Sequence, residues 1–161
     1  MAADFYKSLS EKRIVIAGAG VTGLPVAHAL KSRGAEVRFA DDRISTVEGF
    51  HVSTPASIKG ADFDALLVSP GWREDHPLIL LAKSEGKAIL NEVDFAWFIK
   101  NEINPGQKWL ALTGTNGKTT TVEMVAHIFA CANVNGIACG NVGRTVIESV
   151  LSPEKYDVLI L

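Results

Sequence analysis

Residues 110–121 read Leu110-Ala-Leu-Thr-Gly-Thr-Asn-Gly-Lys-Thr-Thr-Thr121, and the rest of the chain can be interpreted around them. An apolar run, Trp109 to Leu112, predicts a strand that ends at a glycine-containing loop. A helical pattern follows, and its apolar residues are spaced for one buried face: Val122, Val125, Ile128 and Phe129. Loop amides and the positive end of a helix together surround an anion. The order of strand, glycine loop, Lys-Thr and helix therefore predicts a phosphate-binding loop.

Within this loop the side chains suit a nucleoside triphosphate. Lys118 can reach the β- and γ-phosphates, and the hydroxyl of Thr119 can bind Mg²⁺. The strict Gly-x-x-x-x-Gly-Lys-[Ser/Thr] pattern requires glycine where this chain has Leu112. Glycines at 114 and 117 still permit a tight turn, so we interpret the segment as a P-loop variant. The alternative is a chance Gly-Lys-Thr turn.

A second glycine loop lies near the start of the chain. The β-branched run Arg13–Ala17 leads into Gly18-Ala-Gly-Val-Thr-Gly23, a helix is predicted up to Gly34, and Glu36–Ala40 resumes as a strand. Asp41 and Asp42 follow about twenty residues after the glycines, as in a dinucleotide fingerprint. The pattern predicts a diphosphate at a helix N-terminus and a carboxylate near a ribose. NAD and a UDP-sugar both fit, and glycines that serve only a tight turn are the alternative.

The remaining pattern alternates strands with helices, which predicts an α/β protein with two parallel sheets. Strands are expected at 65–68, 88–90, 134–139 and 156–161, and helices at 77–85, 92–100 and 145–151. Residues 44–62 are weakly patterned, with a short strand expected at 50–52 and a helical turn at 55–59. Asn104-Pro-Gly-Gln-Lys108 is the best linker. With the boundary at this linker, we expect a Rossmann-like domain at 1–105 and the beginning of a P-loop ATPase domain at 106–161. The second domain is expected to be incomplete because the chain ends in an apolar strand.

Composition limits the possible partners. Of 161 residues, 47% are hydrophobic and the net charge is −2, which favours a packed core and gives no reason to expect nucleic-acid binding. No apolar run reaches the length of a membrane span, so a cytoplasmic protein without membrane insertion is expected. The two cysteines, Cys131 and Cys139, are expected to be reduced and buried.

Two shorter segments are weaker candidates. Ser69-Pro70-Gly71 follows a predicted strand, at the carboxyl edge where open α/β sheets bind ligands, although a plain turn fits equally. Asn141 lies in the turn Gly140-Asn-Val-Gly143 and could donate its amide to a substrate oxygen, although turns favour asparagine for structural reasons.

With two nucleotide loops in this order, the chain resembles the Mur ligases, ATP-dependent amide ligases of peptidoglycan precursor synthesis. Gly114-Thr-Asn-Gly-Lys-Thr-Thr120 is similar to the P-loop of that family. The segments Gly18–Gly23, Asp41–Arg43, Ser69–Gly71 and Gly140–Gly143 resemble the branch that adds D-glutamate. Asn116 stands where the L-alanine-adding branch usually has histidine.

The resemblance implies specific site residues. For ATP they are Gly114, Thr115, Asn116, Gly117, Lys118, Thr119 and Thr120, with Lys118 and Thr119 in catalysis and Thr119 as the Mg²⁺ ligand. For UDP-MurNAc-L-Ala they are Gly20, Val21, Thr22, Asp41, Asp42, Arg43, Ser69, Pro70, Gly71 and Asn141.

The implied reaction adds D-glutamate to UDP-MurNAc-L-Ala through an acyl phosphate, with ATP and Mg²⁺ as cofactors and a monomeric enzyme. The family has further active-site residues after this point, so the resemblance implies an N-terminal fragment that is inactive alone. The alternatives are an L-alanine-adding Mur ligase, an NAD(P)-binding oxidoreductase, and a nucleotide-binding module without catalysis.

Overall fold

The structure, a computed structural model, describes residues 2–161 and contains two compact units, residues 1–95 and 96–161. Helix α4 (Glu92–Ile103) contains the division between them. The expected domain boundary at residue 105 stays a prediction. Among the described residues, no helix is both long and apolar enough to span a bilayer.

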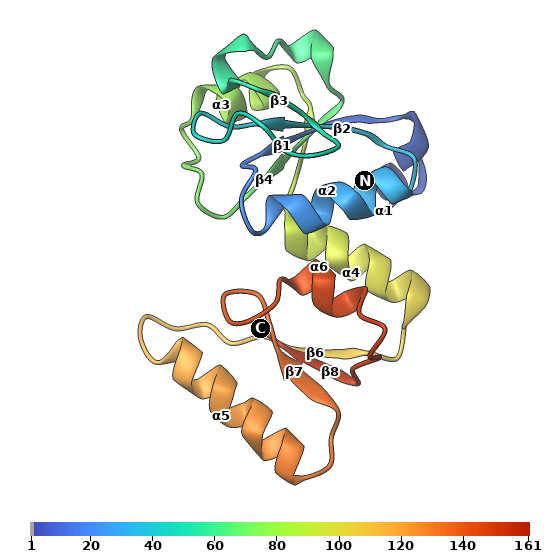
Figure 1. The fold of residues 1–161 in the computed structure, drawn as a ribbon, viewed down its shortest axis with the longest axis vertical. Coiled ribbons are helices and arrows are strands. Elements are labelled where there is room, and N and C mark those ends of the chain that lie inside the picture. Colours follow the sequence, from blue (N-terminus) through green and yellow to red (C-terminus); the bar gives the residue numbers. More distant parts are fainter. Residues whose placement is uncertain (1) are drawn as a thin grey trace. The chain divides into compact units, whose positions relative to one another are not determined.

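The first unit is built on a five-stranded parallel sheet (Figure 1). Its strands are β1 (Arg13–Ala17), β2 (Glu36–Ala40), β3 (His51–Ser53), β4 (Ala65–Val68) and β5 (Ala88–Leu90). Its helices and 3₁₀ turns are α1 (Ala2–Lys7), η1 (Leu9–Glu11), α2 (Gly23–Ser32), η2 (Pro55–Ser57), η3 (Gly60–Asp62), α3 (Pro77–Ser84) and the start of α4. The strand order is β3-β2-β1-β4-β5. The order reverses at β1, which is the position where open α/β sheets bind ligands.

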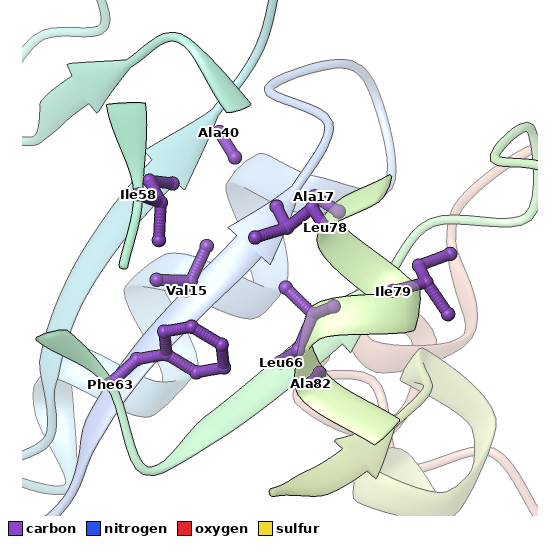
Figure 2. Packing of buried hydrophobic residues seen from close by; sticks show 9 residues of the cluster. All are labelled: Val15, Ala17, Ala40, Ile58, Phe63, Leu66, Leu78, Ile79 and Ala82. Carbon is purple, nitrogen blue, oxygen red and sulfur yellow. The ribbon is translucent and has the colours of Figure 1, made fainter. Parts of the chain in front are cut away.

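Strand β1 is apolar on both faces because both faces are covered. Val15 and Ala17 belong to a cluster that includes Leu66 of β4 and Leu78 and Ala82 of α3, as Figure 2 shows. Ile14 and Ile16, which alternate with them, are also buried. A continuous apolar run is the pattern of a central parallel strand, as the sequence predicted.

The ends of the helices follow from local chemistry. Pro77 occupies the first turn of α3, where it needs no hydrogen-bond partner, and the ring of His76 accepts a hydrogen bond from the Leu78 amide (3.2 Å). Gly34 ends α2 with a positive φ of 87°, a conformation that glycine adopts without strain.

The second unit contains a three-stranded parallel sheet in the order β6-β8-β7. Its strands are β6 (Lys108–Leu110), β7 (Gly136–Ala138) and β8 (Val158–Ile160), and its own helices are α5 (Lys118–Cys131) and α6 (Val146–Val150). Figure 1 shows α5 on one side of this sheet and α6 on the other. The α/β class with parallel sheets is confirmed, and the three strands predicted in this unit are present in shorter form.

Helix α5 differs from its expected packing. Only Val122 of its predicted apolar face is buried, while Val125 and Phe129 are half-buried and Ile128 is 58% exposed. The expectation for the cysteines was half wrong: both are free thiols, but Cys131 at the end of α5 is exposed and only Cys139 is buried. This fourteen-residue helix packs mainly on β7 and β8, so its outer half lies in solvent.

Candidate functional site

The first glycine loop leaves the carboxyl end of β1, the central strand of its sheet. The Gly18 amide donates to the Ala40 carbonyl (2.9 Å), and the Ser69 amide donates to the Ala17 carbonyl (3.1 Å). The loop therefore begins between the ends of β2 and β4. These contacts bring three predicted segments, Gly18–Gly23, Asp41–Arg43 and Ser69–Gly71, to one edge of the first unit.

Each glycine of the loop meets a different requirement. Gly18 has a φ of 102°, and a Cβ on Gly23 would lie 2.1 Å from the Gly18 carbonyl oxygen. Both positions therefore need glycine for the fold alone. Gly20 is exposed, and a Cβ there would have no atom within 4 Å. Its lack of a side chain leaves the backbone open to an approaching group, as the second glycine of a dinucleotide loop does.

The tip of the loop is open to solvent. The Val21 side chain is 82% exposed, which is unusual for a large aliphatic residue. Thr22, at the N-cap of α2, makes no side-chain capping hydrogen bond. The start of α2 thus presents backbone groups and the helix dipole to any anion at this edge.

Asp41 is bonded to the protein backbone. One carboxylate oxygen, Oδ2, accepts from the Ala19 amide at 2.8 Å, and Oδ1 accepts from the amides of Arg43 (2.8 Å) and Ile44 (3.0 Å). Although burial raises the pKa of Asp41, the backbone donors and the Arg43 charge hold it below its ordinary value. Asp42 and Arg43 are exposed. The sequence pattern predicted the same role for Asp41 and Asp42. In the structure the Asp41 carboxylate is bonded to backbone amides, whereas Asp42 is exposed.

Ser69 differs from Asp41 because its hydroxyl has no partner. Among the described residues, its Oγ is one of two buried side-chain polar atoms that lack a hydrogen-bond partner. It lies 3.0 Å from the position that a Cβ on Gly18 would occupy. Pro70 and Gly71 after it are exposed. An unpartnered hydroxyl against the glycine loop is a ready contact for a polar ligand.

Trp72 also lies beside this loop, although its sequence position did not predict it as a site residue. Its indole Nε1 lies 3.1 Å from the same Cβ position on Gly18, and its ring makes an edge contact with His76. An aromatic residue directly after Ser69–Gly71 was the available signal. Its position beside the loop depends on how β4 pairs with β1, which residue spacing alone does not show.

The P-loop is held by its own atoms. Every residue from Thr113 to Thr121 is exposed, and Gly117 is the N-cap of α5 in the left-handed region, with a φ of 75°. The Thr121 hydroxyl donates to the Gly117 carbonyl (2.9 Å), and the Lys118 ammonium donates to the Gly114 carbonyl. The lysine is thus folded over the loop and is free to exchange this contact for a phosphate oxygen.

Asn141 lies in a separate loop of the second unit. It is exposed, and the Gly140 amide closes this loop by donating to the Arg144 carbonyl (2.8 Å). Gly140 and Gly143 both have positive φ values, 91° and 69°. The turn predicted after β7 is therefore present, and a ligand role for Asn141 stays a prediction.

Metal binding would depend on few protein groups. Over residues 2–161, no cluster of three or more His, Cys, Asp or Glu side chains could hold a metal ion. The exposed Thr119 hydroxyl at the start of α5 suits a Mg²⁺ ion whose other ligands come from phosphates and water.

The chain is similar to known proteins. The chain is 33% identical over 159 residues to a UDP-N-acetylmuramoylalanine–D-glutamate ligase of Corynebacterium diphtheriae and 36% identical over 165 residues to one of Thermobifida fusca. These alignments cover 92% and 94% of this chain but only 34% and 35% of the relatives. The chain thus spans about a third of their length. No protein-family model matches it.

A solved structure shows the same fold. It is a UDP-N-acetylmuramate:L-alanyl-gamma-D-glutamyl-meso-diaminopimelate ligase from Neisseria meningitides, 20% identical, with a TM-score of 0.51. The match covers 92% of this chain and 51% of that one.

Proposed function

We propose that this chain supplies the UDP-substrate domain and the P-loop of a D-glutamate-adding Mur ligase. The chain belongs to the Mur ligase family and spans about a third of the length of the D-glutamate ligases that it matches. The activity proposed for the whole protein is ATP-dependent addition of D-glutamate to UDP-MurNAc-L-Ala. The observation that carries the proposal is the presence of two glycine loops, each leaving a parallel strand for a helix, with different constraints on their glycines. A nicotinamide oxidoreductase would leave the second loop without a role.

The first unit suits a uridine diphosphate group. The diphosphate is proposed to lie over Gly20, Val21 and Thr22, where the backbone is open and α2 begins. The exposed Asp42 and Arg43 are proposed to contact the uridine. Ser69 supports this placement because its unpartnered hydroxyl lies against the same loop. Pro70 and Gly71 complete the proposed set in this unit.

The second unit suits MgATP. The loop residues 114–120 are proposed to surround the β- and γ-phosphates, Lys118 to neutralise their charge and Thr119 to bind Mg²⁺. ATP would supply the phosphoryl group that activates the alanine carboxylate, and the amine of D-glutamate would then displace phosphate. Phosphoryl transfer depends on positioning and charge neutralisation, so these groups need no nucleophilic side chain beside them.

Binding measurements on the 161-residue chain test the first step. Isothermal titration calorimetry with UDP, UDP-MurNAc-L-Ala and NADH should show binding of both uridine ligands and competition between them. Binding of NADH without competition by UDP would support an oxidoreductase instead. ATP with Mg²⁺ should bind independently of UDP. Light scattering in the same samples tests the expected monomer.

Activity measurements need the longer protein that the relatives represent. Phosphate release should require ATP, UDP-MurNAc-L-Ala and D-glutamate together. Release with UDP-MurNAc and L-alanine instead would identify an L-alanine ligase. Neither pair is expected to support release by the 161-residue chain alone.

A further inference from the structure

The carboxylate of Asp41 connects two segments that belong to different parts of the first site. Its Oδ2 accepts from the Ala19 amide in the glycine loop, and its Oδ1 accepts from the amides of Arg43 and Ile44 after β2. These segments are far apart in sequence, since Ala19 and Asp41 are 22 positions apart.

This contact requires two acceptor oxygens in a short side chain. An asparagine has one acceptor and one donor. If its oxygen served the Arg43 and Ile44 amides, its NH₂ group would face the Ala19 N–H, and the opposite orientation would leave the turn without an acceptor. A glutamate carries the same two oxygens but places them one methylene further out. Aspartate is therefore specifically suited to this position.

The contact determines how the open part of the loop is presented. Ala19 is buried and immediately precedes Gly20, whose carbonyl accepts from the Leu24 amide (3.2 Å) in the first turn of α2. Fixing the Ala19 peptide therefore fixes the direction of the exposed backbone that follows. The same carboxylate holds the turn that carries the exposed Asp42 and Arg43.

We propose that Asp41 is a positioning residue of the first site, which joins the glycine loop to the Asp41–Ile44 turn and acts on the ligand through both. The inference rests on the proposed function, because the ligand concerned is the uridine diphosphate. Three of the roughly four acceptor sites of this carboxylate are used within the protein. Asp41 thus differs from its neighbour Asp42, which is available for direct contact.

The experiment compares Asp41→Asn with a matched control, Asp64→Asn. Asp64 also accepts a backbone hydrogen bond, from the Arg13 amide at 2.8 Å, but at the amino end of β1. Hydrogen exchange is measured residue by residue by NMR in the ligand-free chain, and UDP affinity by calorimetry. In Asp41→Asn we expect the Ala19 amide to exchange at least about tenfold faster and UDP to bind at least about tenfold more weakly. In Asp64→Asn both values should stay close to those of the unmodified chain.

The ligand-free exchange separates positioning from direct contact. If Asp41→Asn weakens UDP binding while exchange at Ala19, Arg43 and Ile44 is unchanged, Asp41 acts by touching the ligand and the proposal is wrong. Should Asp41→Asn fail to fold, the unmodified chain still decides, because rapid exchange at Ala19 there would contradict the hydrogen bond. Absence of UDP binding by the unmodified chain would refute the proposed function, whereas the exchange data would still report on the loop.

Discussion

The two glycine loops of this chain occupy equivalent places, between a parallel strand and a helix, but they are stabilised differently. The first loop is anchored from outside, because Asp41 accepts a hydrogen bond from the Ala19 amide and the Ala40 carbonyl accepts one from the Gly18 amide. In the second loop, the Lys118 and Thr121 side chains donate hydrogen bonds to carbonyls of the same loop. The same local architecture can therefore be held by tertiary contacts or by local ones. Substitutions should affect stability at the first loop and mainly binding at the second.

The largest effect is expected for Gly23→Ala. The new Cβ would lie 2.1 Å from the Gly18 carbonyl oxygen, so the backbone must move. We expect the free energy of unfolding to fall by about 3 kcal/mol. We also expect UDP binding to be lost. Urea denaturation measures the first quantity and calorimetry the second. Gly20→Ala is the control for the fold: its Cβ meets no atom within 4 Å, so stability should be retained while UDP binding weakens. Equal stability of the two variants would show that the close approach of Gly23 to the Gly18 carbonyl does not limit the fold.

Lys118→Ala should show the opposite behaviour. The Lys118 ammonium is exposed and donates a hydrogen bond to the loop carbonyl of Gly114, so the free energy of unfolding should be unchanged. MgATP affinity should fall by about 1.5–3 kcal/mol, the usual contribution of a hydrogen bond to a charged group. Fluorescent-nucleotide titration provides the measurement. Lys155→Ala removes another exposed lysine of the same unit and should leave ATP affinity unaltered.

A smaller effect is expected for Gly117→Ala. Alanine in the left-handed region costs about 1 kcal/mol, and Gly117 has a φ of 75° with no atom near its Cβ position. Thermal unfolding of the second unit should therefore shift down slightly. Gly114→Ala is the comparison, since its nearest atoms would be at an ordinary 3.7 Å. A larger loss of stability for Gly114→Ala than for Gly117→Ala would show that crowding, rather than backbone conformation, limits this loop.

The smallest effect concerns pH and the amino end of β1. Hydrogen bonds from the Arg13 guanidinium and amide lower the pKa of Asp64 to about 2. Because the folded-state pKa is depressed, the stabilisation is complete above the ordinary value of about 4 and is lost as the pH falls through the folded-state pKa. Asp64→Asn should thus lower Tm slightly at pH 7, and the difference should shrink as the pH falls through that value. A constant Tm difference over this range would show that the ion pair does not cause it.

Some elements followed directly from residue order. The runs at 13–17, 36–40, 65–68 and 88–90 were expected as strands and are strands. At 13–17 and 65–68 the signal is strongest, because buried parallel strands need consecutive apolar residues. The buried face predicted for α5 was partly wrong. Helical spacing shows which residues share a face, but it does not show how much of that face the sheet covers. Ile128 is exposed for that reason.

The sequence by itself determined the α/β class, the two glycine loops and the acidic turn after β2, because these depend on neighbouring residues and their spacing. Only the tertiary structure decided the different roles of Asp41, Asp42 and Ser69. Their differences depend on which backbone amides lie within about 3 Å of each oxygen. The Arg43 and Ile44 amides are sequence neighbours of Asp41. The pairing of β2 with β1, and not residue order, brings the Ala19 amide to it. The contrast between the two loops has the same origin: one lies between paired strands, and the other projects into solvent.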